Sequence, residues 1–337
     1  MMKRARLAAG TALALAAALA ATGCSSGASA PESNEATTSE APQELTTIKV
    51  ATTPNIVMGA LFLGIEQGIF EEEGLKVETT AVANPPAGIA AAQSGQVDFA
   101  YSPSIPLLNA LSQSVPVRVV APADGYESGA IDSPDLAQVD DTGFYAGAAS
   151  GITELSQLEG RTIAVPARKA HLEVVITAAL VDAGVDPNSV NWVALDYASA
   201  ITSLGNGTID AAGLASPFTF QAAEEGAHLL LSPSIEFFRE GAVGVWTTGT
   251  TTADQKPEVI AAFQRAIVKA NAYANENPEL AIEAGLAAAN STLTADQVNP
   301  PYWPTEMDID DIERVNEKLV KLGFLPAKVD LDGLIIE

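Results

Sequence analysis

Apolar positions along the chain fall into short alternating or continuous runs, separated by stretches with helical spacing. Runs rich in Val, Ile and Thr predict strands, because β-branched residues favour extended backbone. Gly68 and Gly95 follow helical stretches, as glycine commonly does at helix ends. The predicted strands are 47–52, 75–80, 97–101 and 115–121, with helices at 56–67, 84–95 and 105–113. Strand–helix alternation of this kind predicts a parallel sheet with crossover helices.

The second half of the chain repeats this alternation after an interruption. Residues 125–150 are rich in Asp, Gly and Ser and predict a loop. A run at 243–247 predicts a strand that returns to the first half of the fold. The other predicted strands are 161–166, 190–195, 209–214 and 228–231, and the helices are 169–183, 198–205, 217–225, 257–275, 278–289, 294–298 and 309–322.

One short pattern occurs in both halves. Residues 89–100 and 201–212 each contain Ile, five residues, Gly, one residue, an apolar residue followed by Asp, one residue and Ala. In each copy a helix is predicted to stop at the glycine, and a strand begins directly afterwards with Asp at its second position. The repetition favours two related α/β lobes.

The first residues indicate export. Residues 1–23 have a basic start, an apolar run at 7–21 and small residues at the end, which is the layout of a secretory signal peptide. That run is shorter than the roughly 20 residues of a membrane span. The following Cys24 resembles the lipidated cysteine of bacterial lipoproteins, and residues 24–45 predict a disordered tether. We therefore expect an extracytoplasmic chain, held to the cell membrane by a lipid on Cys24 after signal cleavage.

Composition narrows the function classes. The formal net charge is -25, from 42 acidic and 17 basic residues, so the chain should repel nucleic acid rather than bind it. The single cysteine excludes a disulfide framework within the chain. His171 and His228 stand without a G-x-S-x-G elbow, and no G-x-G-x-x-G follows the first strand. We expect no enzyme, no cofactor and no metal site.

Six segments, in this order, carry a family resemblance. They are GIEQGIFEEEGL at 64–75, SGQVDFA at 94–100, ITELSQLEGRTIAV at 152–165, GNGTIDAA at 205–212, NENPE at 275–279 and LGFL at 322–325. Together they resemble the nitrate/sulfonate/taurine-binding family of ABC-transporter substrate-binding lipoproteins. That family also holds binders of thiamine pyrimidine precursors and of aromatic carboxylates.

The resemblance implies an α/β, two-lobe, periplasmic-binding-protein-like fold of type II. Two parallel or mixed sheets with flanking helices would be joined by a two-segment hinge. Lobe 1 would comprise residues 46–140 plus 240–337, and lobe 2 residues 141–239. A small-molecule ligand would bind in the cleft between them and pass to ABC permease and ATPase subunits. A ligand-sensing lipoprotein without an importer is the alternative outside transport.

Candidate ligand contacts follow the predicted strands, because open parallel sheets bind ligands beyond the carboxyl ends of their strands. Arg168 and Lys169 stand out, since cations at a helix start oppose its dipole unless an anion lies nearby. Helix capping, ion pairing or core packing could also explain each candidate. The candidate ligand-binding residues are Thr53, Pro54, Asn55, Asn84, Pro85, Ser102, Pro103, Ser104, Arg168, Lys169, His171, Asp196, Tyr197, Ser216, Phe218 and Trp246.

Two ligand chemistries remain open at this point. The basic pair favours a small organic anion, a carboxylate or a sulfonate such as taurine or an alkanesulfonate. The aromatic residues Tyr101, Tyr197, Phe218 and Trp246 could instead hold a flat ring, such as a pyrimidine. The sequence does not choose between them.

Overall fold

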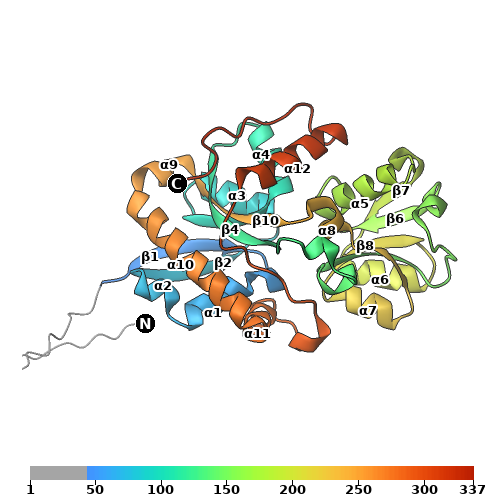
Figure 1. Ribbon diagram of the computed structural model, residues 1–337, viewed down its shortest axis with the longest axis horizontal. Helices are drawn as coiled ribbons and strands as arrows, with labels where there is room; N and C mark the ends of the chain where they lie inside the picture. Colours follow the sequence, from blue (N-terminus) through green and yellow to red (C-terminus); the bar gives the residue numbers. More distant parts are fainter. Residues whose placement is uncertain (1–43) are drawn as a thin grey trace, which may run out of the picture. The chain divides into compact units, whose positions relative to one another are not determined.

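The computed structural model describes residues 44–337, so the expected signal peptide and Cys24 lie outside the described residues, as does all but the end of the expected tether. Ten strands form two five-stranded sheets (Figure 1). The strands are β1 Thr46–Thr52, β2 Leu75–Ala81, β3 Phe99–Pro103, β4 Val117–Tyr126, β5 Thr142–Ala146, β6 Thr162–Val165, β7 Asn191–Ala194, β8 Ala211–Ala215, β9 His228–Leu231 and β10 Gly241–Gly249.

Helices connect and cover these strands. The α-helices are α1 Gly59–Glu66, α2 Ile69–Glu72, α3 Pro85–Gln93, α4 Ser104–Ser112, α5 His171–Asp182, α6 Tyr197–Gly205, α7 Phe218–Glu224, α8 Pro233–Phe238, α9 Thr250–Gln255, α10 Pro257–Glu276, α11 Pro278–Ala288 and α12 Ile309–Lys321. Short 3-10 turns are η1 Ile56–Met58, η2 Ala130–Asp132, η3 Leu136–Gln138, η4 Leu155–Leu158, η5 Pro187–Ser189 and η6 Ala295–Gln297. Of the helices within 44–337, none has both the length and the hydrophobicity that a bilayer crossing requires.

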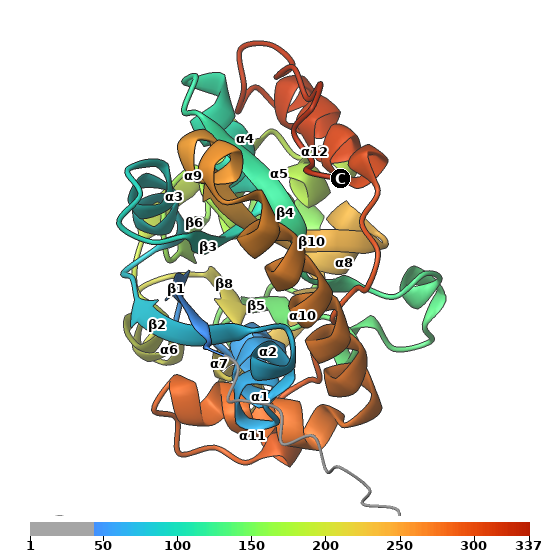
Figure 2. The ribbon, with the colours of Figure 1, turned by 90° about the vertical axis from the view of Figure 1, so that its left-hand side faces the viewer.

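The first sheet has the order β2-β1-β3-β10-β4. Strands β2, β1 and β3 run parallel, whereas β10 is antiparallel to both of its neighbours. Alternation along the strands separates the two faces. Ile48 and Val50 of β1 pack with α10 residues such as Phe263, while Ala51 packs with Ala92 of α3. Helices α1 and α10 therefore cover one face, and α3, α4 and α12 cover the other (Figure 2).

The second sheet has the order β7-β6-β8-β5-β9. It repeats the first, with a parallel set, β7, β6 and β8, and an antiparallel strand, β5, next to it. Ile163 of β6 faces the core that contains α5, whereas Ala164 faces the cluster formed with α6 and α7. The expected α/β fold with two mixed sheets and flanking helices is confirmed, and neither sheet closes into a barrel.

The repeated sequence pattern forms the same structure in both sheets. Gly95 and Gly207 have φ of 75° and 72°, a backbone that glycine adopts without strain, and each ends a helix. The side chain of Asp98 then accepts a hydrogen bond of 2.8 Å from the backbone N–H of Lys49, and Asp210 accepts one of 2.8 Å from Thr162. These equivalent bonds support the relation between the halves that the sequence pattern indicated.

The predicted loop at 125–150 was wrong in part. Strand β4 continues to Tyr126, and β5 lies inside the segment. All five residues of β5 are buried between β8 and β9, so tertiary pairing overrides a composition that favours a loop. The chain passes from the first sheet to the second between β4 and β5, and it returns between α8 and β10. Both crossings lie beside the cavity described next.

Candidate functional site

A cavity of about 220 Å³ lies where strand ends of both sheets meet. It is lined from the first sheet by residues after β1 and at the ends of β3 and β4, and from the second by residues around β5, β6 and β8. A segment before α12 also contributes to it. The polar and aromatic lining residues are Asn55, Tyr101, Asp124, Tyr126, Asp141, Thr142, His171, Tyr197, Ser234 and Tyr302. This is the position at which open α/β sheets bind ligands.

Asp124 enters the cavity from the end of β4. The missing side chain of Gly244 on the adjacent β10 makes room for it, since a Cβ there would lie 2.0 Å from Asp124 Oδ1. Burial raises the pKa of Asp124 to about 6, although the neighbouring Tyr101 hydroxyl lowers it in part by hydrogen bonding. The Oδ1 atom itself is shielded from solvent and has no partner in the protein.

Asp140 and Asp141 are adjacent but have different environments. Asp140 is 1% exposed and accepts hydrogen bonds from five donors. Asp141 lines the cavity, and burial raises the pKa of its carboxyl to about 8, with the charges of Asp140 and Asp124 adding to the effect. Asp140 is therefore a structural carboxylate, and Asp141 is the one available to a ligand.

A chain of hydroxyl groups fixes the tautomer of His171. Thr142 donates its hydroxyl proton to Asp140 at 2.8 Å and so accepts from the Ser234 hydroxyl at 2.7 Å. Ser234 must then accept from His171 Nε2, which lies 2.8 Å away. Burial lowers the pKa of His171 to about 4, so the ring is neutral at pH 7. Nδ1 is consequently an unprotonated acceptor, and it has no partner in the protein.

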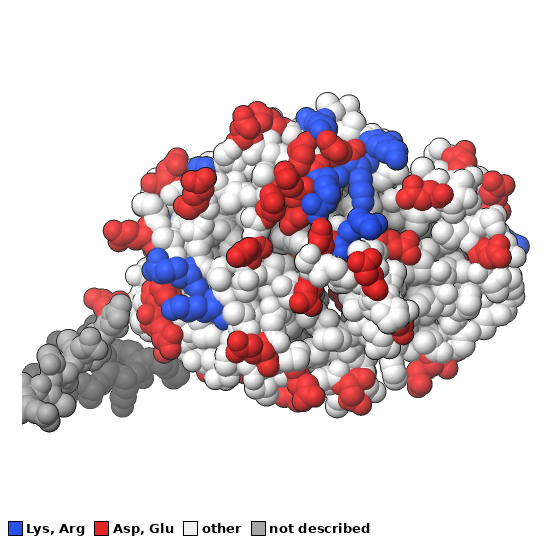
Figure 3. Space-filling view, in the orientation of Figure 1, with Lys and Arg blue, Asp and Glu red and all other residues white. Residues whose placement is uncertain are grey.

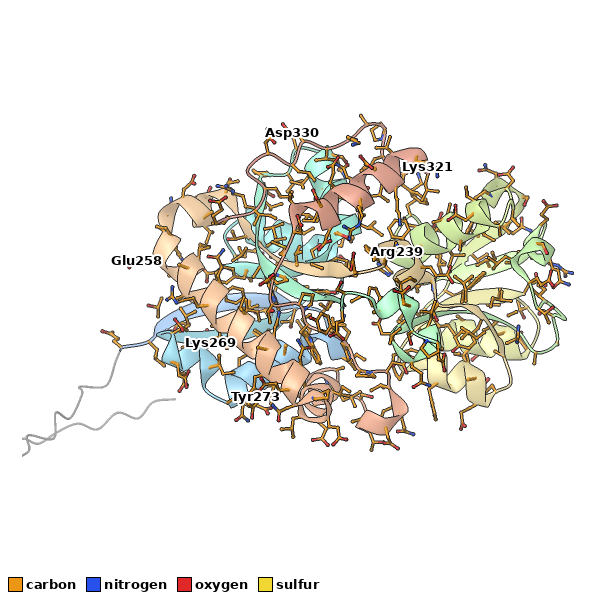
Figure 4. The ribbon with its side chains drawn as sticks, viewed as in Figure 1. Arg239, Glu258, Lys269, Tyr273, Lys321 and Asp330 are labelled. Carbon is orange, nitrogen blue, oxygen red and sulfur yellow. The ribbon has the colours of Figure 1, made fainter. Side chains whose placement is uncertain are left out.

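The charge pattern of the lining is acidic. Among the described residues that line the cavity there is no Lys or Arg. Basic side chains gather elsewhere on the face shown in Figure 3, in one group beside α10 and another over α12. Figure 4 places Lys269 on α10, Lys321 at the end of α12, and Arg239 where α8 leads into β10. The cavity thus presents carboxyl groups, a neutral imidazole and tyrosines.

Four predicted contacts lie together in this cavity: Asn55, Pro103, His171 and Tyr197. They come from the segment after β1, the end of β3 and the starts of α5 and α6, as the strand-end argument expected. Tyr197 also stacks on Phe218, with the ring centroids 5.2 Å apart. Phe218 therefore supports the cavity wall without lining it.

Arg168 and Lys169 lie outside this lining, in a separate surface depression. The guanidinium of Arg168 donates to both carboxylate oxygens of Glu173, at 2.7 and 3.1 Å. The backbone N–H of Lys169 donates to the same carboxylate. Glu173, in the first turn of α5, therefore supplies the anion that the Arg168 guanidinium required at this helix start.

The remaining predicted contacts also lie outside the lining, and most have structural partners. Asn84 and Asp196 accept from backbone N–H groups as caps of α3 and α6, and Pro85 occupies the first turn of α3. Trp246 is 1% exposed and packs edge-on against Tyr101 and Phe263 in the core. The others are Thr53, Pro54, Ser102, Ser104 and Ser216, in the segments after β1 and β8 and around the end of β3.

The sequence argument missed the two cavity carboxyl groups. Asp124 follows the apolar run of β4 at the end of a strand, and Asp141 precedes the buried residues of β5. Because residues 125–150 were interpreted as a loop, neither acid was placed at a strand end. An acid directly beside a buried apolar run was the available signal, since charged residues are seldom buried without a reason.

Gly244→Ala is expected to lower the free energy of unfolding by about 1–3 kcal/mol, the usual cost of overpacking. The new Cβ would lie 2.0 Å from Asp124 Oδ1 and 2.7 Å from Tyr101 Cε2, so both must move. Urea unfolding followed by circular dichroism measures the change. Gly205→Ala in α6 is the matched control, because the nearest side-chain atom is 3.6 Å away. Equal stability of the two variants would contradict the tight contact.

Comparison with solved structures identifies the fold as that of periplasmic binding proteins. The alkanesulfonate-binding protein SsuA of Xanthomonas axonopodis pv. citri, bound to MOPS, superposes with a TM-score of 0.66 at 14% identity, covering 87% of this chain and 99% of SsuA. The ligand-binding component of an ABC-type import system from Staphylococcus aureus gives 0.66 at 13% identity, covering 86% and 96%.

Sequence comparison then gives the family. The model described as NMT1/THI5 like matches residues 55–281, more than half of the chain, and the chain belongs to this family. The taurine-binding periplasmic protein of Escherichia coli is 26% identical over 211 residues, which cover 62% of this chain and 61% of that protein. Four Brucella relatives, named only as binding proteins, are 22% identical over 222 residues, and the chain spans 63% of their length.

Proposed function

We propose that this chain is a solute-binding protein of an ABC importer, which captures a small organic solute in the cavity and delivers it to the permease and ATPase. The cavity carries this proposal, because it is built from the strand ends of both sheets. The family and the fold support it, and relatives in this fold are named for sulfonates and taurine. A sulfonate or carboxylate is therefore the first solute class to test.

Capture would involve closure of two lobes, 46–140 plus 240–337 and 141–239. The links between β4 and β5 and between α8 and β10 would serve as the hinge, since hinge motions are absorbed by a few residues at element ends. Closure would bring Asp124, on β4, toward Asp141 and the starts of α5 and α6. A permease could then distinguish the closed form by differential contacts.

Anchoring by a lipid on Cys24 would keep the protein beside its permease. The sequence before and at Cys24 supports this proposal, and the relatives include periplasmic binding proteins. Cys24→Ala is expected to release the protein from the membrane fraction and to remove the mass of the acyl groups. Unchanged membrane association with no acyl mass on the native chain would refute the anchor.

A flat aromatic solute is the second candidate, because four tyrosines line the cavity. Tyr101, Tyr126, Tyr197 and Tyr302 could stack on a ring or enclose it. Comparing the binding of aliphatic and aromatic compounds in one ligand panel would distinguish a small organic anion from a flat aromatic solute.

The function is tested by thermal shift of the purified full-length protein against small sulfonates, carboxylates, pyrimidines and an extract of cell metabolites. A solute that binds only the folded state raises the melting temperature. At a concentration of 100 times its Kd it adds about 2.7 kcal/mol to the free energy of unfolding. Uptake of that solute by cells should fall when the gene is deleted. Absence of any shift, on folded protein, would refute solute binding.

A further inference from the structure

The cavity contains four acceptor groups that no donor of the protein satisfies. Asn55 uses its amide N–H to reach Thr53 Oγ1 at 3.2 Å, which leaves its Oδ1 without a partner. Asp124 Oδ1 and His171 Nδ1 are likewise shielded from solvent and unpaired. Within residues 44–337, the Asp141 carboxyl receives no hydrogen bond from another residue. All four residues line the same cavity.

Two of the polar donors in the lining are already committed. The Tyr126 hydroxyl donates to Asp140 at 2.9 Å, and His171 Nε2 donates to Ser234. No Lys or Arg of the described chain lines the cavity. A buried acceptor without a donor is costly, and more so when it is charged. A partner that brings both N–H groups and positive charge would satisfy these acceptors and favour the ionised form of the two carboxyl groups.

We infer that the captured solute carries a cationic nitrogen group, a protonated amine or amidine, which binds between Asp124 and Asp141. Asn55 Oδ1 and His171 Nδ1 would accept its remaining N–H bonds. The inference rests on the proposed function and adds to it the chemistry of the solute, which can bear an acid group at its other end. The tyrosine rings that line the cavity would favour the same cation.

A metal ion fits the arrangement less well. Within the described residues, no group of three or more His, Cys, Asp and Glu side chains is arranged to hold one. Asp124 and Asp141 come from different strands, β4 and the start of β5, on either side of the first link between the sheets. An organic nitrogen cation with several N–H bonds can reach both carboxyl groups and the imidazole.

The test compares ligands that differ only in this nitrogen. The pairs are taurine with isethionate, β-alanine with 3-hydroxypropionate, and benzamidine with benzamide. We expect the nitrogen cation of at least one pair to raise the melting temperature while its partner does not. By calorimetry, Asp124→Asn and Asp141→Asn should each weaken the binding of that cation about 10-fold or more, since bonds to charged groups are worth about 1.5–3 kcal/mol.

Asp186→Asn is the matched control, since Asp186 is an exposed cap of η5 outside the cavity and asparagine caps equally well. This variant should bind as the native chain does. Equal or stronger binding of the uncharged partner in the pairs that bind would overturn the inference, as would a shift with Zn²⁺ or Ca²⁺ alone. Identification of an anion without nitrogen as the solute captured from the metabolite extract would overturn it while leaving the proposed function intact. If nothing binds, the proposed function fails and the inference with it.

Discussion

Asp140→Ala is expected to lower the free energy of unfolding by about 3 kcal/mol or more, because it leaves several buried donors unpaired at about 1–3 kcal/mol each. The carboxylate accepts from the Tyr126 hydroxyl and from both donors of Thr142, at 2.8–2.9 Å. It also accepts from the backbone N–H groups of Ser234 and Ile235, both at 2.9 Å. One side chain thus joins the end of β4, the start of β5 and the first turn of α8.

Urea unfolding of the full-length chain measures this loss, with Asp186→Ala as the control. Asp186 also caps backbone N–H groups, but it is exposed, so its removal should cost only about 1 kcal/mol. Asp140→Asn should fall between the two, because the amide keeps one acceptor oxygen. A change below 1 kcal/mol in Asp140→Ala would show that the buried donors find other partners and that Asp140 does not join the two crossings.

Much of the architecture follows from local sequence signals. Ile48 and Val50 alternate with smaller or polar neighbours, and Gly95 and Gly207 mark helix ends by a backbone that glycine adopts freely. The strands of both parallel sets were therefore predictable. Strand β5 was not, because Thr142–Ala146 is short and it is buried by β8, β9, α7 and α8, which are distant in the sequence.

The site was predictable to a smaller degree, and for a related reason. Asn55, His171 and Tyr197 follow strands or begin helices, so the general position of ligand sites in open sheets located them. Asp124 depends on the space left by Gly244 on β10, more than a hundred residues later in the chain. Arg168 was predicted to need an anionic ligand, yet its partner is Glu173, five residues later in the first turn of α5. The pattern of charges along the sequence therefore did not predict which residues these charged side chains contact in the fold.

The melting temperature of the ligand-free protein is expected to fall by about 3 °C between pH 6.5 and pH 8, from about 2 kcal/mol of lost stability. The pKa of Asp141 is raised from its ordinary value of 3.8 to about 8 by burial and by the charges of Asp140 and Asp124. A carboxyl with a raised pKa contributes stability that is complete below its unfolded value and is lost as the pH rises through its folded value.

The other ionisable groups that line the cavity do not account for the loss of stability between pH 6.5 and pH 8. Asp124, with a pKa of about 6, has lost its contribution by pH 6.5. His171, with a pKa lowered to about 4, contributes stability that is complete above its unfolded value near 6.5 and falls only toward acid. The neighbouring Tyr101, Tyr126 and Tyr197 have raised pKa values, so they remain neutral. Burial also raises the pKa of the adjacent Asp140, which lies outside the cavity lining, so the Asp141→Asn variant is needed to assign the fall above about pH 6.5 to Asp141.

Asp141→Asn should therefore abolish the fall between pH 6.5 and 8, whereas Asp186→Asn should retain it; differential scanning calorimetry at matched ionic strength compares them. Binding of a cationic solute should also change this pH dependence. A cation beside Asp141 favours the ionised carboxylate, so the melting temperature of the complex should not fall between pH 6.5 and 8. A flat native profile, or an equal fall in both variants, would show that Asp141 is ionised throughout. The empty cavity would then hold two full negative charges at neutral pH.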